Sequence, residues 1–243
     1  MSDFNTFEKL GESCEICVTK EHTFGTDAFL LADFAKARHK DIVCDLGTGC
    51  GIIAVLMRLR YEPKQVYGVD IQPQAIEQFE LTVNRSGLKE TYPLLMDLKA
   101  LTNDAPLGRC DLVTCNPPYK AAKAGIESEL SAHKIARHEI LCNISDVCAA
   151  GNKLLKYGGR LCLCNRPERL ADVMCAMRDN DIEPKYLRFV SKSPNDAPWL
   201  FLIEGRKGGG SFMQVLPQLY ISGSGGISPE LAQIYGKTDE RTE

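Results

Sequence analysis

Four consecutive residues, Asn116-Pro117-Pro118-Tyr119, could bind and activate a planar amine. They follow the apolar run 110–115, which predicts a β-strand, and Pro117 favours an extended conformation of Asn116. The prolines would hold the Asn116 amide oxygen and the Pro117 carbonyl together, so that both accept hydrogen bonds from one NH2 group. Such binding draws a conjugated nitrogen towards tetrahedral geometry and stabilises positive charge forming on it. Tyr119 offers a flat face for a stacked base; a plain proline-rich loop is the alternative.

A glycine-rich turn at residues 45–51 could hold a nucleoside-type cofactor. Asp45 ends the preceding strand, and Gly47, Gly49 and Gly51 let the backbone turn sharply and lie against a ligand. In dinucleotide-binding turns the third glycine comes three positions after the second, where this chain has isoleucine. The spacing therefore favours S-adenosyl-L-methionine, which carries no pyrophosphate, over a dinucleotide or a plain tight turn.

Two further carboxylates follow the next predicted strands. Asp70 closes the run 66–70 and could accept both hydroxyls of a ribose. Asp97 follows the run 92–96 and could accept a hydrogen bond from an adenine amine. Each has a simpler explanation, Asp70 as a helix cap and Asp97 as a solvent-exposed turn residue. The glycine turn makes binding the preferred interpretation of Asp70, whereas both interpretations stay open for Asp97.

These residues all fall at the ends of strands in an alternating pattern of strands and helices. Two late strands have no helix between them and predict an antiparallel pair. We therefore expect a doubly wound α/β fold with a mainly parallel seven-stranded sheet, whose carboxyl edge binds ligands. The expected strands are 42–46, 66–70, 92–96, 110–115, 160–164, 186–190 and 199–204, with helices at 52–60, from Pro73 to Gly87, from Ile144 to Gly158 and from Pro167 to Met177.

The chain divides into three predicted parts. Residues 1–40 form a lead-in whose helix is capped by Thr26 and Asp27, residues 41–221 form the cofactor-binding domain, and residues 222–243 form a weakly ordered tail. A helix ending at Gly158 and Gly159 is expected immediately before the strand 160–164.

Composition excludes several classes of protein. The 243 residues carry a formal charge of −3, with 25% charged residues, which are ordinary values for a soluble globular chain. No apolar run reaches the roughly 20 residues of a membrane span, and the polar start predicts no secretory leader. Eleven scattered cysteines predict reduced thiols in a cytoplasmic protein. Cys14-x-x-Cys17 has no second pair or nearby histidine at zinc spacing, so no metal site is predicted.

The motifs at 45–51, Asp70 and 116–119, in this order, resemble those of class I S-adenosylmethionine-dependent methyltransferases that act on amino nitrogens. A second set resembles the bacterial tRNA(Val) adenine-37 N6-methyltransferase group, and the likeness spans about residues 20–221. That set is Thr23-Phe24-Gly25-Thr26-Asp27-Ala28, Ala136-Arg137-His138-Glu139, Gly158-Gly159-Arg160, Arg166-Pro167-Glu168-Arg169-Leu170 and Leu187-Arg188-Phe189-Val190.

The resemblance implies a role for each motif. The glycine turn and Asp70 would hold the cofactor, with Asp97 near its adenine, and residues 24–27, including Thr26 and Asp27, would cover its methionine end. Asn116, which would also touch the cofactor, and Pro117 would grip the N6 amine of a flipped-out adenine stacked on Tyr119. The partner would be tRNA, and an anticodon-loop base is single-stranded and costs little to unstack.

Basic residues fit an RNA partner without requiring one. They could contact phosphates near the site, or they could be ordinary solvated side chains. These residues are Lys120, Lys123, Lys134, Arg137, Arg166 and Arg169.

Three other functions remain to be weighed. A glutamine-N5 methyltransferase of release factors would use the same four residues, but a large helical domain precedes the sheet in such enzymes and only some 40 residues are available here. An NAD-dependent oxidoreductase would need the third glycine and a catalytic pair. A non-catalytic RNA-binding or cofactor-sensing module would not need residues 116–119.

Overall fold

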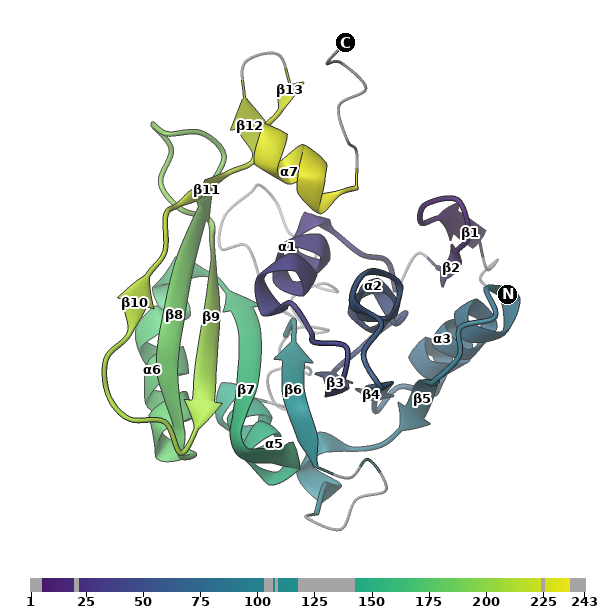
Figure 1. Ribbon diagram of the computed structural model, residues 1–243, viewed down its shortest axis with the longest axis horizontal. Coiled ribbons are helices and arrows are strands. Elements are labelled where there is room, and N and C mark those ends of the chain that lie inside the picture. Colours follow the sequence, from purple (N-terminus) through teal and green to yellow (C-terminus); the bar gives the residue numbers. More distant parts are fainter. Residues whose placement is uncertain are drawn as a thin grey trace, which may run out of the picture.

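The computed structural model describes residues 6–19, 22–102, 107, 109–117, 143–223 and 226–236, and it is organised around one mixed β-sheet (Figure 1). Within these residues the strand order is β10-β8-β9-β7-β6-β3-β4-β5, with β11 beside β8. The long strands are β3 (Ile42–Leu46), β4 (Gln65–Asp70), β5 (Thr91–Leu95), β6 (Cys110–Cys115), β7 (Leu155–Asn165), β8 (Ile182–Ser191) and β9 (Leu200–Lys207).

All neighbours in the series from β5 to β7 are parallel, and β9 runs antiparallel to both β7 and β8. Two short strands, β10 (Gln214–Val215) and β11 (Leu219–Tyr220), add parallel pairing at the outer edge of β8. The prediction of a doubly wound, mainly parallel sheet with a C-terminal antiparallel pair is confirmed.

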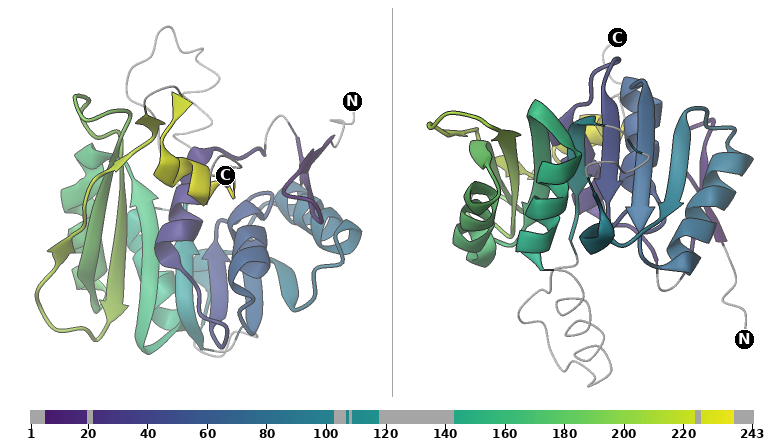
Figure 2. Two further views of the ribbon diagram at one scale, coloured as in Figure 1. Left: turned by 45° about the horizontal axis from the view of Figure 1, so that its top comes forward. Right: turned by 90° about the horizontal axis from the view of Figure 1, so that it is seen from below.

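Helices cover both faces of this sheet (Figures 1 and 2). One face carries α1 (Thr26–Ala35), α2 (Ile52–Tyr61) and α3 (Pro73–Arg85), and the other carries α5 (Ile144–Leu154) and α6 (Leu170–Asp179). Two short 3-10 turns, η1 (Leu98–Ala100) and η2 (Pro167–Arg169), follow β5 and β7.

Successive side chains of the strands alternate between the two faces of the sheet, and each face has its own apolar core. In β7, Cys162 and Cys164 pack with α1 and α2, whereas Leu161 and Leu163 pack with α5 and α6. Successive side chains of a strand point to opposite faces, so a strand covered on both sides is apolar throughout. Among the described residues the cysteines are free thiols, all buried except Cys175.

The boundary between α5 and β7 differs from the prediction. The helix ends at Leu154, and β7 begins at Leu155 and runs through the two glycines instead of starting at Arg160. The β6–β7 register shifts between Cys110, opposite Leu155, and Leu112, opposite Arg160. Gly158, with φ +77°, allows this irregularity in the strand and does not end a helix.

The first part of the chain contains a hairpin in addition to the predicted helix. Strands β1 (Thr6–Lys9) and β2 (Glu15–Val18) pair antiparallel and lie beside α3 (Figure 1). The Cys17 backbone N–H donates to Thr82 Oγ1 over 2.9 Å, so α3 provides the support that an isolated hairpin lacks.

The described part of the segment from Ser222 to Gly236 also differs from the predicted weakly ordered tail. It contains a small hairpin, β12 (Ser222–Gly223) and β13 (Gly226–Ile227), followed by α7 (Pro229–Ile234), which lies against α1 (Figure 2). Ser228 caps α7 by accepting from the Leu231 N–H, and Leu231 and Ile234 are buried. These two apolar anchors hold the segment on the domain. Within the part of the chain that the structure describes, no helix has the length and apolar character needed to cross a bilayer.

Candidate active site

The glycine turn joins β3 to α2 at the carboxyl edge of the sheet. Gly47, Gly49 and Gly51 all have positive φ, at +66°, +55° and +86°. A Cβ on Gly51 would lie 2.2 Å from the ring of Phe79 in α3, whereas one on Gly47 or Gly49 would meet no atom within 4 Å. Gly51 therefore allows α3 to pack closely, and the other two glycines border open space in which a ligand could approach the backbone.

Asp45 lies beneath this turn with its side chain buried. Its Oδ2 accepts from the Thr48 hydroxyl and its Oδ1 from the Thr114 hydroxyl of β6, both over 2.7 Å. Burial raises the pKa of Asp45 to about 7, although the hydrogen bonds from Thr114 and Thr48 oppose this. The carboxyl group thus ties the glycine turn to β6, and its predicted contact with a cofactor stays a prediction.

Asp70, at the end of β4, faces the same turn. Its Oδ2 accepts from the Gly49 N–H over 2.9 Å and its Oδ1 from the Gln72 N–H over 3.0 Å. The N-cap of α3 is Gln72, so the helix-cap alternative does not describe Asp70. A carboxylate has about four acceptor positions, so these bonds leave capacity for the predicted ribose hydroxyls.

Asp97 is exposed and caps η1, because its Oδ1 accepts from the Lys99 N–H over 2.9 Å. The turn interpretation thus accounts for its position, and its contact with an adenine stays a prediction. Sequence reasoning missed two apolar side chains nearby, Ile71 and Leu95, which are 49% and 56% exposed. Ile71 directly follows Asp70, the acid that ends the strand. This position in the sequence could have predicted an apolar side chain that packs against the adenine of a cofactor.

Asn116 follows the last residue of β6 and lies on the α1 side of the sheet, as alternation with Leu112 and Thr114 dictates. Its Nδ2 donates to Asp27 Oδ2 over 3.1 Å, and its Oδ1 accepts from the Cys164 thiol over 3.1 Å. The structure thus joins two residues, Asp27 and Asn116, for which the motifs implied separate roles towards cofactor and substrate. Pro117 follows Asn116, and the other members of the motif, Pro118 and Tyr119, lie outside the described residues.

Thr26 faces the C-terminal segment of the chain. Its Oγ1 is 2.7 Å from the hydroxyl of Tyr235, just after α7, and either group can be the donor. The segment that contains α7 therefore supports the start of α1 and, with it, the position of Asp27. The predicted contact of Thr26 with a cofactor stays a prediction.

Of the basic residues considered for RNA, two have described contacts. Arg166 Nη1 donates to the Trp199 carbonyl over 2.9 Å, and its guanidinium lies 5.3 Å from the centre of the Trp199 ring. Arg166 thus holds the start of β9. Arg169 pairs with Asp172 over 2.8 Å. The other candidates, Lys120, Lys123, Lys134 and Arg137, lie outside the described residues.

Comparison with known proteins identifies relatives of this chain. A family model described as methyltransferase small domain matches residues 19–169, which is more than half of the chain. A tRNA1(Val) (adenine(37)-N6)-methyltransferase of Histophilus somni (strain 129Pt) is 29% identical over 158 residues, which make up 64% of each chain. The enzyme of the same name from Aeromonas salmonicida (strain A449) is 26% identical over 204 residues, 83% of each chain.

The fold itself is shared with solved structures. A predicted O-methyltransferase from Agrobacterium tumefaciens superposes with a TM-score of 0.69 at 18% identity, covering 87% of this chain and 96% of that one. At this identity the likeness concerns the fold alone.

Proposed function

Since this chain belongs to the methyltransferase small domain family, we propose that it methylates the N6 amine of an adenine in tRNA, with S-adenosyl-L-methionine as methyl donor. The named activity of the curated relatives points to adenosine 37 of a valine tRNA as the target. An unpaired anticodon-loop base can enter a pocket at a small cost in stacking.

The position of Asn116 carries this proposal. Its amide stands at the end of β6, in the same edge of the sheet as the glycine turn, with a defined orientation between Asp27 and Cys164. An amide oxygen is an acceptor suited to an exocyclic amine, whereas an alcohol or carbon nucleophile would call for a base. The amide oxygen of Asn116, at the end of β6, would accept a hydrogen bond from such an NH2 group.

The described residues also fit the methyl donor. The backbone at Gly47 and Gly49 borders open space, Asp70 keeps acceptor capacity for a ribose, and Ile71 supplies an exposed apolar side chain beside it. These groups would hold the nucleoside part of the cofactor, whose adenine would lie towards the ends of β4 and β5.

When bound, S-adenosyl-L-methionine supplies a methyl group on a sulfonium sulfur and leaves as a neutral thioether. Asn116 Oδ1 can still accept from a substrate amine, because a carbonyl oxygen has a second lone pair beside the one that faces Cys164. Accepting an N–H bond draws the nitrogen lone pair out of conjugation and stabilises positive charge on the nitrogen. The methylated nitrogen then releases one proton to solvent, so no strong base is required.

The test is transfer of a labelled methyl group to an unmodified tRNA(Val) transcript, followed by nucleoside mass spectrometry. N6-methyladenosine should form, and a transcript with guanosine in place of the target adenosine should remain unlabelled. Asn116→Ala should lower kcat by about 100-fold or more and leave the affinity for S-adenosylhomocysteine within about twofold. If the label instead enters a glutamine of a release factor, the substrate class is an amide in a protein.

A further inference from the structure

The amide of Asn116 is held from two sides by residues of different elements. Asp27, in the first turn of α1, accepts from Nδ2 through Oδ2, and Cys164, in β7, donates its thiol hydrogen to Oδ1, each over 3.1 Å. Cys164 is fully buried, while Asp27 and Asn116 are half-buried. These three residues thus lie at the boundary between the core and the open carboxyl edge.

These partners determine which way the amide faces. An asparagine side chain turned by 180° keeps its shape but exchanges its acceptor for its donor. A carboxylate can only accept, so Asp27 favours Nδ2 on its own side and disfavours a turn that would oppose two oxygens. The acceptor Oδ1 therefore faces away from Asp27, on the side of Cys164. A reversed amide would present a donor to a substrate amine and could not bind it.

Asp27 is itself held in place. Its Oδ1 accepts from the Ala28 N–H over 3.0 Å, and the neighbouring Thr26 is bonded to Tyr235. At the other end of α1, Arg160 Nη1 donates to the Ala35 carbonyl over 2.7 Å. Both ends of α1 are thereby tied to other elements, and the carboxylate reaches Asn116 from a fixed helix.

We propose that Asp27 is a positioning residue for methyl transfer, which keeps the Asn116 oxygen directed towards the substrate amine and increases its strength as an acceptor. A hydrogen bond from the amide N–H to an anion polarises the amide and leaves more negative charge on its oxygen. The carboxylate charge also favours the positive charge that develops on the substrate nitrogen. This role rests on the proposed function. In it Asp27 binds the side chain of Asn116 and not the methionine end of the cofactor.

The experiment compares Asp27→Ala and Asp27→Asn with Asp33→Ala, a matched control that removes a carboxylate from the same helix. At saturating S-adenosyl-L-methionine, Asp27→Ala should lower kcat by about tenfold to 100-fold. The affinity for S-adenosylhomocysteine, measured by calorimetry, should stay within about twofold. Asp27→Asn should recover part of kcat, because its amide oxygen can accept the same hydrogen bond. Asp33→Ala should match the wild type.

A second measurement follows the amide directly. The side-chain NH2 signals of Asn116 can be assigned in 15N–1H NMR spectra by their loss in Asn116→Ala. They should shift in Asp27→Ala, which removes the bond to Oδ2, and stay in place in Asp33→Ala. Unchanged signals in Asp27→Ala would overturn the proposed contact, whatever the activity.

The two proposals fail in distinguishable ways. If the wild-type protein methylates no adenine in tRNA, the proposed function fails, while NMR still tests the contact between Asp27 and Asn116. If the wild type is active and Asp27→Ala keeps its kcat, the positioning role alone is wrong. A loss confined to S-adenosylhomocysteine affinity would instead make Asp27 a cofactor ligand.

Discussion

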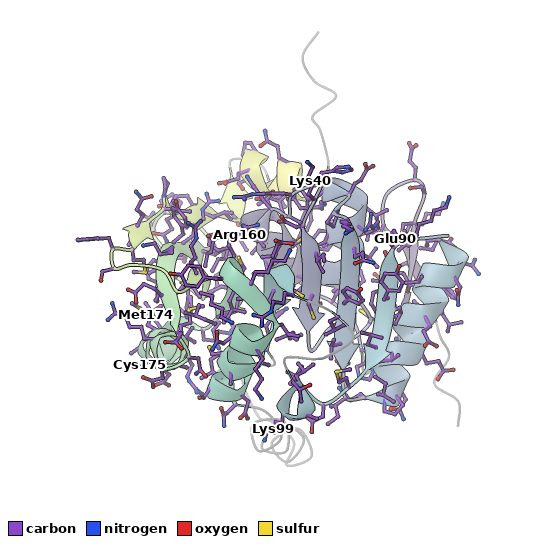
Figure 3. All side chains as sticks on the ribbon, turned by 60° about the horizontal axis from the view of Figure 1, so that its bottom comes forward. Lys40, Glu90, Lys99, Arg160, Met174 and Cys175 are labelled. Carbon is purple, nitrogen blue, oxygen red and sulfur yellow. The ribbon has the colours of Figure 1, made fainter. Side chains whose placement is uncertain are left out.

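The glycine turn and a hollow at the opposite edge of the central sheet are bordered by different residue types, acidic at the first and mainly basic at the second. At the carboxyl edge, Asp27, Asp45, Asp70 and Asp97 lie around the glycine turn and Asn116. At the amino edge there is a hollow of about 730 Å³ lined by Lys40, Arg58, Lys64 and Lys89, with Glu62 as the one acid in its lining among the described residues. Figure 3 shows Lys40 and Lys99 at opposite ends of the sheet.

The polarity of the helices accounts for this difference. Helices α1, α2 and α3 end at Ala35, Tyr61 and Arg85, so their C-termini gather at the amino edge. The partial negative charge of a helix C-terminus favours basic side chains, and unpaired carbonyls there accept from them. Arg160, for example, donates to the carbonyl of Ala35, the last residue of α1, over 2.7 Å.

A charged edge is therefore not by itself a binding site. The bases of the amino edge compensate helix ends, and similar compensation acts on the acids of the carboxyl edge, where helices begin. The carboxyl edge differs because Asn116 presents an acceptor of defined orientation beside the glycine turn. We infer that only this edge takes part in catalysis, and the following predictions test that view.

The largest expected effect on cofactor binding distinguishes two glycines, one at each edge. Gly49 and Gly87 have similar φ values, +55° and +59°, and a Cβ on either would meet no protein atom within 4 Å. Changing either to alanine should cost a similar unfolding free energy, about 1–2 kcal/mol, from the left-handed backbone. Only Gly49→Ala should also weaken S-adenosylhomocysteine binding, by about tenfold or more, because its methyl group would enter the cofactor space.

Calorimetry and thermal unfolding of the two variants would measure both effects. Equal affinities in Gly49→Ala and Gly87→Ala would mean that the cofactor does not approach the turn at Gly49.

A second prediction concerns Asp45 and the pH dependence of stability. Because its pKa is raised to about 7 in the folded protein, the unfolded chain loses this proton at lower pH than the folded one. Stability from this group is therefore highest below about pH 4 and declines until about pH 7, by at most about 4 kcal/mol. Asp45→Asn cannot ionise and should lack this decline.

Urea unfolding of the wild type and Asp45→Asn at several pH values would isolate the contribution, since other groups are common to both. Parallel curves would show that Asp45 is ionised in the fold, and the carboxyl edge would then carry one more negative charge for ligand binding.

The smallest effect is expected at the amino edge. Replacing Lys40, Lys64 and Lys89 together by alanine should change kcat and the KM for tRNA by less than about twofold, and should lower stability only slightly, because exposed charges contribute little. A tenfold rise in the KM for tRNA with a reduced salt dependence would contradict the inference that only the carboxyl edge takes part in catalysis. The amino edge would then contact RNA phosphates as well.

Local sequence features predicted most of the sheet and its carboxyl edge. The alternation of apolar runs and helical periodicity placed the long strands, although β7 begins at Leu155 and not at Arg160. The hairpin of β1 and β2 escaped prediction because it depends on Thr82, which lies 65 residues from its partner Cys17. Helix α7 escaped because Leu231 and Ile234 are buried by contacts with distant elements, α1 and β11.

For the site, local sequence was enough to predict that Asn116 would directly follow a strand and precede Pro117, and that glycines would turn the chain at 47, 49 and 51. Steric limits on neighbouring residues are local, so any fold must obey them. The position of Asp27, 89 residues away and opposite the Asn116 amide, depends on tertiary packing. A hydrogen bond between distant side chains depends on how α1 packs on the sheet, which no run of neighbouring residues encodes.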